Sequence, residues 1–158
     1  MVEFILETNS AEATRRVGSR LAAELGRPAV VALSGQLGAG KTQFVKGLGQ
    51  GLGLDPARIC SATFVLIAEY GEQPRLVHID AYRLSKPEEL ENIGFEELVT
   101  EADTLVAIEW SEKILPLLPA DHVAVHLEIL DDHRRRISLR AVGAGEKFAE
   151  ALRRVRDV

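Results

Sequence analysis

A glycine-rich stretch in the first third of the chain has the residue types that hold a polyphosphate. Residues 35–42 read Gly-Gln-Leu-Gly-Ala-Gly-Lys-Thr and fit the pattern G-x-x-x-x-G-K-[ST]. A backbone that wraps phosphate oxygens with inward N–H groups needs glycines wherever a Cβ would clash. In such a loop the Lys41 ammonium reaches the β- and γ-phosphates, and the Thr42 hydroxyl binds Mg²⁺. The pattern therefore predicts a site for a nucleoside triphosphate and Mg²⁺.

The residues on either side of this stretch form the setting that a phosphate loop requires. Residues 28–33 read as a short buried strand, and apolar residues recur at helical spacing from Phe44 to Leu52. A helix that begins at the loop adds the partial positive charge of its N-terminus to the site. This context favours a phosphate loop over a plain glycine-rich turn. The residues then expected to contact the nucleotide are Gly35, Gln36, Leu37, Gly38, Ala39, Gly40, Lys41, Thr42 and Gln43.

Two acidic residues each close an apolar strand further along the chain. Asp80 ends a strand predicted over residues 75–80, and Glu109 ends one predicted over residues 103–109. If these strands run parallel to the strand before the loop, their carboxyl ends share the sheet edge where ligands bind. We expect Glu109 to hold Mg²⁺ together with Thr42, either directly or through the ion's second shell. Asp80 should then orient the attacking water or join the metal's shell.

A further strand, predicted over residues 64–70, brings two hydroxyl groups to the same edge. Only four residues join it to the next strand, so the two must be antiparallel. Its start, with Ser61 and Thr63, then lies beside the end of the neighbouring strand. The catalytic side chains expected to converge there, although far apart in sequence, are those of Lys41, Thr63, Asp80 and Glu109.

Composition narrows the class of protein. A chain of 158 residues with 46% hydrophobic content suits one domain with a single core. A net charge of −5 argues against a protein that coats nucleic acid by itself. The single cysteine excludes an internal disulfide, and neither a signal peptide nor a membrane-length apolar run is seen. We therefore expect a soluble cytoplasmic protein without a membrane partner.

The same patterns predict the remaining elements. Near the N-terminus they are an edge strand over residues 4–6 and a helix capped by Asn9 or Ser10. Two short helices divided by Gly94 follow within residues 86–100. The last elements are a hairpin from residues 123–129 and 137–139 and a C-terminal helix with Phe148, Leu152 and Val155 on its inner face. Strands that alternate with helices, together with two antiparallel pairs, predict an α/β fold. Its mixed, mostly parallel sheet should carry helices on both faces.

In this order and spacing the motifs resemble the bacterial TsaE (YjeE) family. The motifs are residues 35–42, Ser61-Ala62-Thr63-Phe64, His78-Ile79-Asp80-Ala81-Tyr82-Arg83-Leu84, Pro87-Glu88-Glu89-Leu90 and Ile108-Glu109-Trp110. The resemblance extends over nearly the whole chain. It implies a single P-loop NTPase-like domain over residues 1–158, an ATPase needed for the threonylcarbamoyladenosine modification of tRNA.

The resemblance also implies partners and residue roles. Family members hydrolyse ATP with Mg²⁺ inside a complex with TsaD and TsaB, which implies only an indirect contact with tRNA. The family's Mg²⁺ positions match Thr42 and Glu109, and its aspartate tied to hydrolysis matches Asp80. Thr63 matches the threonine of a switch-like loop near the γ-phosphate. Ala62 stands where the family usually has proline, so the backbone of this loop is less restricted.

Two more residues are candidates for nucleotide contacts. Trp110, the sole tryptophan, either packs in the core or lines the nucleotide site. Among the three arginines at 134–136 the resemblance points to Arg135 near the nucleotide, and a solvated turn is the alternative. His78 lies inside a strand and is interpreted as structural, and Cys60 lacks a neighbouring base and is interpreted as inert.

Two other functions fit the phosphate loop. A small-molecule or nucleotide kinase would share the loop and use the arginines as a lid, but no acceptor-binding residues are identified. A nucleotide-gated scaffold would bind ATP and barely hydrolyse it. A GTPase is disfavoured because the chain has no Asn-Lys-x-Asp motif.

Overall fold

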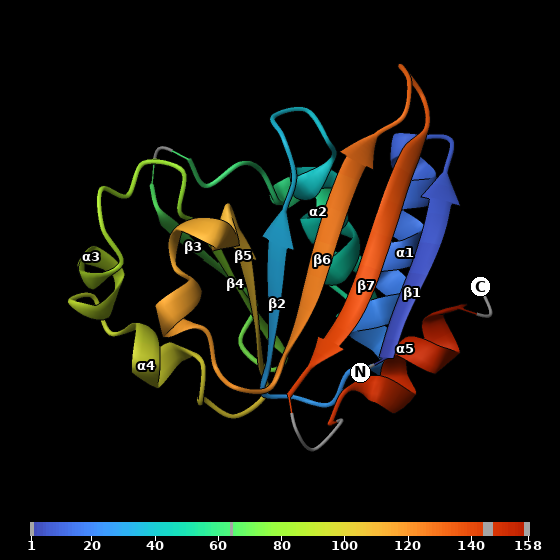
Figure 1. The fold of residues 1–158 in the computed structure, drawn as a ribbon. Helices are drawn as coiled ribbons and strands as arrows, with labels where there is room; N and C mark the ends of the chain where they lie inside the picture. The colour runs from blue at the N-terminus through green and yellow to red at the C-terminus, as the bar shows by residue number, and fades with distance from the viewer. Residues whose placement is uncertain (1, 64, 144–146, 157–158) are drawn as a thin grey trace.

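A single seven-stranded sheet organises the protein. The computed structural model describes residues 2–63, 65–143 and 147–156. The strands are β1 (Val2–Thr8), β2 (Ala29–Ser34), β3 (Ile67–Tyr70), β4 (Arg75–Asp80), β5 (Thr104–Glu109), β6 (His122–Ile129) and β7 (Arg135–Val142), in the spatial order β1-β7-β6-β2-β5-β4-β3. The pairings leave β3 and β7 antiparallel to the other strands (Figure 1). The predicted mixed, mostly parallel sheet is confirmed.

The centre of the sheet sets the register on which the site depends. β2 lies between β6 and β5 and is parallel to both, and its residues 29–33 are buried, as expected of a strand covered on both faces. The register pairs Leu33 with Glu109, and Glu109 in turn with Asp80. The ends of β2, β5 and β4 therefore meet at one edge of the sheet, as the sequence predicted.

Helices cover both faces, which confirms the second part of the predicted fold. They are α1 (Ala11–Glu24), α2 (Lys41–Gly51), α3 (Glu88–Glu91), α4 (Phe95–Leu98) and α5 (Ala149–Arg156), with short 3₁₀ turns at Pro56–Arg58, Ser111–Lys113 and Leu115–Leu117. The helices α1, α2 and α5 share one apolar core with the sheet. On the opposite face, residues of α3 and α4 form a second core with β4 and β5.

Alternation along β4 and β5 decides which side chains face α2. In β5, Leu105 and Ala107 belong to the core under α1 and α2, whereas Val106 and Ile108 belong to the core on the other face. By the same period of two, Glu109 faces α2. In β4, Leu76 faces α2, and His78 and Asp80 follow it on the same face. The face under α2 is thus apolar through most of its length, and its polar side chains in β4 and β5 are His78, Asp80 and Glu109.

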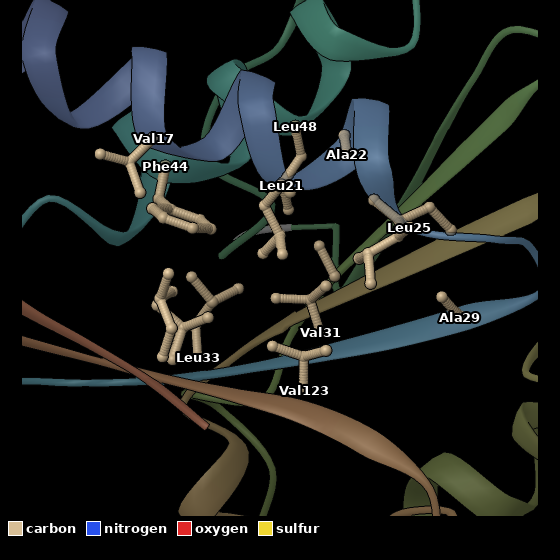
Figure 2. Packing of buried hydrophobic residues seen from close by; sticks show 14 of the residues in the cluster. Val17, Leu21, Ala22, Leu25, Ala29, Val31, Leu33, Phe44, Leu48 and Val123 are labelled. Atoms are coloured by element: carbon tan, nitrogen blue, oxygen red, sulfur yellow. The ribbon is translucent and has the colours of Figure 1, made fainter. Parts of the chain in front are cut away.

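Glycines let α1 and α2 pack with their backbones nearly in contact. A Cβ on Gly47 would lie 2.1 Å from the Arg15 carbonyl oxygen, and one on Gly18 would lie 2.5 Å from the Phe44 carbonyl oxygen. Apolar side chains of both helices, among them Leu21 and Phe44, fill the space between the helices and β2 (Figure 2). This packing stabilises α2, whose many glycines give it a low intrinsic tendency to form a helix.

The segment before β3 differs from the strand predicted over residues 64–70. The strand begins only at Ile67, because Leu66 has a positive φ of 68° and accepts a hydrogen bond from the Asp80 N–H. Phe64 lies outside the described residues. The predicted antiparallel pairing of this strand with β4 is confirmed.

Other local predictions are confirmed with small shifts. Ser10 caps α1 by accepting a hydrogen bond from the Ala13 N–H, and Gly94 separates α3 from α4. β6 and β7 form the predicted hairpin, and Leu152 and Val155 of α5 are buried. Within the described part of the chain, none of the helices has the length and apolar character needed to span a bilayer.

Gly47→Ala should destabilise the fold, because its Cβ would meet the backbone of α1 rather than a movable side chain. We expect a loss of about 1–3 kcal/mol in the free energy of unfolding, larger than the ~1 kcal/mol that alanine gains in helix propensity. Urea denaturation measures the difference. Gly26→Ala is the control, since a Cβ there meets nothing within 4 Å. Equal midpoints for the Gly47 variant and the parent protein would contradict the packing argument.

Candidate functional site

The phosphate loop rises from the end of β2 and turns into α2. Gly35 has a φ of 141°, and a Cβ there would lie 2.5 Å from the Leu127 carbonyl oxygen of β6. Gly40 precedes the first helical residue with a φ of 104°, which L side chains rarely adopt. The loop can therefore follow its path only with glycine at these positions, and the free N–H groups at the start of α2 remain available to a ligand.

Lys41, the first residue of α2, folds back over its own loop. Its ammonium donates hydrogen bonds to the carbonyl oxygens of Gly35 and Gln36, the second at 3.1 Å. The same Nζ atom lies 3.9 Å from the centre of the Trp110 ring. Burial lowers the pKa of Lys41, and the nearby carboxylate of Glu109 opposes that shift. Lys41, 5% exposed, is thus held against the carbonyl oxygens of its own loop.

Thr42 and Glu109 form a contact between α2 and the end of β5. The Thr42 hydroxyl lies 3.2 Å from each oxygen of the Glu109 carboxylate. Glu109 is 3% exposed, and its Oε2 atom also lies 2.5 Å from the Nε2 atom of His78. The structure therefore places the two predicted metal-binding residues side by side.

Asp80 and Thr63 form a second contact at the same edge. The Thr63 hydroxyl donates to Asp80 Oδ2 at 2.7 Å, and the Tyr82 N–H donates to Asp80 Oδ1 at 2.9 Å. The Ser61 hydroxyl lies 2.7 Å from the Thr63 hydroxyl. Asp80, 2% exposed, thus ties the segment before β3 to the end of β4.

Two hollows flank the phosphate loop. One, of about 310 Å³, is lined among others by Lys41, Thr42, Thr63, Asp80, Glu109 and Trp110. The other, of about 290 Å³, is lined by residues at the start of α1 and at the β6–β7 hairpin, among them Ser10, Thr14, Asp132, His133 and Arg135. Gly38, Gly40 and Gln43 line both hollows. A ligand with two chemically different ends can therefore lie across the loop.

Arg135 reaches the loop from the β6–β7 hairpin. Its Nε and Nη2 atoms donate to the carbonyl oxygens of Ala39 and Gly38, both at 3.2 Å. The hairpin turn is held by Asp131, whose carboxylate accepts from the Arg134 side chain and from two backbone N–H groups. The Arg134 hydrogen bonds keep the pKa of Asp131 well below its usual range. Figure 1 shows this turn and the phosphate loop at the same edge of the sheet.

The donor set at the edge suits Mg²⁺. Mg²⁺ prefers oxygen ligands, and proteins usually hold it through one or two carboxylates together with substrate phosphates and waters. The Thr42 hydroxyl and the Glu109 carboxylate supply such oxygens beside the loop, and Asp80 lines the same hollow. The residues therefore fit this ion.

The structure brings together most of the residues that the sequence singled out. Lys41, Thr63, Asp80 and Glu109 line one hollow, as expected from the strand directions. Trp110, for which the sequence left two interpretations open, lines that hollow while half-buried. The catalytic, cofactor-binding and metal-binding roles assigned from the sequence remain predictions.

Two of the predicted loop residues, Leu37 and Gln43, line the hollows with side chains that are exposed or bonded to another residue. Leu37 is 78% exposed, so its side chain is open to solvent. The Gln43 side chain accepts a hydrogen bond of 2.7 Å from Arg15. The contact between His78 and Glu109 was missed, although the available signal was that His78 precedes Asp80 by two residues and so shares its face.

The chain is similar in sequence to a family of known proteins. The family model described as "Threonylcarbamoyl adenosine biosynthesis protein TsaE" matches residues 8–137. A protein of Treponema pallidum named tRNA threonylcarbamoyladenosine biosynthesis protein TsaE is 41% identical over 132 residues, which cover 84% of this chain and 96% of the relative. A protein of Streptomyces coelicolor with the same name is 38% identical over 145 residues, covering 87% and 95%.

A solved structure extends the similarity to the fold. The crystal structure of YdiB from Bacillus subtilis superposes with a TM-score of 0.80 at 28% sequence identity. The match covers 99% of this chain and 97% of the other. The similarity therefore includes the β6–β7 hairpin and α5 as well as the phosphate-loop unit.

Arg135→Met should loosen the phosphate loop, because it removes the donors to the Gly38 and Ala39 carbonyl oxygens. We expect the loop amides to exchange with solvent about five- to tenfold faster, from the loss of hydrogen bonds worth about 1 kcal/mol in sum. Hydrogen–deuterium exchange of residues 36–40 measures the effect. Arg136→Met is the matched control, because Arg136 pairs with Glu128 on the sheet. Equal exchange in both variants would show that Arg135 does not restrain the loop.

Proposed function

The chain belongs to the TsaE family of threonylcarbamoyladenosine biosynthesis proteins, and we propose that its part in this pathway is to bind ATP with Mg²⁺ and hydrolyse it. The observation that carries the proposal is the meeting of Lys41 and Thr42 of the loop with Glu109 and Asp80 at one edge of the sheet. A buried cation, a hydroxyl and two carboxylates beside a phosphate loop are the parts that phosphoryl transfer requires.

We propose that the triphosphate lies over the loop with its γ-phosphate toward Asp80. Lys41 would leave the carbonyl oxygens of Gly35 and Gln36 and donate to phosphate oxygens instead. The nucleoside end would lie in the hollow lined by Ser10 and Thr14. This orientation rests on Lys41, Asp80 and Glu109, the groups suited to phosphates and Mg²⁺, which line the other hollow.

Thr42 and Glu109 would hold Mg²⁺, which neutralises charge that develops on the phosphates. Their oxygens are already adjacent, so little rearrangement of the chain is needed. Asp80 accepts a hydrogen bond from Thr63, and this pair would orient the attacking water. Little covalent help from the protein is needed, because hydrolysis depends mainly on placement and charge neutralisation.

We also propose that the chain works with TsaD and TsaB in the cytoplasm and contacts tRNA only through them. The proposal rests on the resemblance to TsaE proteins and on the net charge of −5, which disfavours direct binding to a polyanion. Co-purification with TsaD, and a rise in ATP turnover when TsaD and TsaB are added, test it. Unchanged turnover and no co-purification would count against this partnership.

ATP binding should change the fluorescence of Trp110, the only tryptophan, because Lys41 lies over its ring. Lys41→Met should weaken ATP binding about 10- to 100-fold, through loss of charge-assisted hydrogen bonds worth about 1.5–3 kcal/mol. Fluorescence titration with ATP measures both affinities. Lys86→Met, an exposed lysine outside both hollows, is the control and should bind as the parent does. Equal affinities for all three proteins would refute the proposed phosphate contact.

Glu109→Gln and Asp80→Asn should each lower ATP turnover about 100-fold or more, because each removes a charge that positions the reacting groups. Phosphate release, alone and with the partner proteins, measures turnover. Glu128→Gln on the exposed face of β6 is the control. Full activity in both site variants would remove these assignments.

Transfer of phosphate to an added nucleoside or sugar would instead identify a kinase.

A further inference from the structure

His78 is a buried polar side chain whose presence the fold alone does not require. It lies in the middle of β4 with no exposed surface. Leu76, two residues earlier on the same face, is equally buried and belongs to the apolar core under α2. Among the described residues, the Nδ1 atom of His78 has no hydrogen-bond partner. An apolar side chain at this position would avoid leaving that atom unpaired.

Within the described part of the chain, the His78 side chain makes its one polar contact with the carboxylate proposed to bind the metal. Its Nε2 atom lies 2.5 Å from Glu109 Oε2. Mg²⁺ binds the ionised form of a carboxylate, which only accepts hydrogen bonds, so the proposed role assigns the His78 proton to Nε2. A buried, unpaired Nδ1 atom destabilises the fold, and its retention needs an explanation. The contact with Glu109 supplies one.

The geometry around Glu109 shows what the contact does. The carboxylate has one partner from β4 and one from α2, because His78 lies on Oε2 and the Thr42 hydroxyl lies 3.2 Å from both oxygens. Rotation of the carboxylate about its last bond would break the bond to His78. Because His78 of β4 hydrogen-bonds Oε2, the other oxygen, Oε1, stays beside the Thr42 hydroxyl.

We propose that His78 is a positioning residue that holds the Glu109 carboxylate in the orientation at which Glu109 and Thr42 bind Mg²⁺ together. The proposal rests on the proposed function, since it concerns the metal that accompanies ATP. Groups that hydrogen-bond a metal-binding carboxylate fix its direction, and their loss weakens metal binding even though they never touch the ion.

Two variants whose side chains have equal length separate the effect of the hydrogen-bond donor from the effect of side-chain size. His78→Gln keeps an N–H donor at about the reach of Nε2, whereas His78→Met fills similar space without a donor. Calorimetry with a non-hydrolysable ATP analogue, in Mg²⁺ and again in EDTA, gives for each protein the factor by which Mg²⁺ tightens binding. We expect His78→Met to reduce that factor about tenfold or more, with an unchanged affinity in EDTA. His78→Gln should restore most of it.

Two further proteins complete the test. His122→Met is the control, because His122 lies at the opposite end of the sheet and bonds the Pro119 carbonyl oxygen. It should leave the Mg²⁺ factor unchanged. In a Glu109→Gln background, His78→Met should add no further loss, because the carboxylate that it positions is gone.

The possible results are distinct. An unchanged Mg²⁺ factor in His78→Met overturns the proposal, and so does an equal loss of affinity in Mg²⁺ and EDTA, which would indicate a purely structural role. An additive loss in the Glu109→Gln background also overturns it. Absence of binding by the parent protein would instead refute the proposed function itself.

Discussion

The structure of the candidate site depends on keeping one cation and two carboxylates buried at a single edge of the sheet. Lys41, Asp80 and Glu109 are all nearly excluded from solvent, and a buried charge is tolerated only where it is hydrogen-bonded or paired. The ligand-free chain meets this requirement with its own groups. Lys41 uses loop carbonyls, Glu109 uses Thr42 and His78, and Asp80 uses Thr63 and a backbone N–H. These partners are the ones that a magnesium-bound triphosphate would replace or join.

The scaffold makes this edge possible by supplying rigid elements from several directions. β2 lies between β6 and β5, and close glycine packing fixes α2 against α1. The start of α2, and with it Lys41 and Thr42, therefore has little freedom relative to the strand ends. From the other side, the β6–β7 hairpin brings Arg135 to the loop carbonyls. The site thus depends on packing that is remote from the proposed chemistry.

The two hollows beside the loop differ in the residues that line them. The hollow toward β4 and β5 is lined by Asp80, Glu109 and the buried Lys41, whereas the hollow toward α1 is lined by hydroxyl groups, Asp132 and Arg135. The proposed function uses the first hollow for the phosphates with Mg²⁺ and the second for the nucleoside. Ser61 and Thr63 line the hollow toward β4 and β5, and the Thr63 hydroxyl bonds Asp80. Movement of this segment would therefore reach the residue proposed to orient water.

The sequence by itself determined the phosphate loop, the ends of β4 and β5 and the sheet edge at which both acids lie. Local patterns carry this information, because glycine spacing marks a loop and the period of two marks a strand face. Only the tertiary structure decided that His78 meets Glu109, that Arg135 rests on the loop carbonyls and that β3 begins at Ile67. These features depend on strand register, hairpin geometry and one left-handed backbone conformation at Leu66. The contacts of His78 and Arg135 join residues far apart in the chain, and a local pattern can give the face on which a residue lies but not its partner.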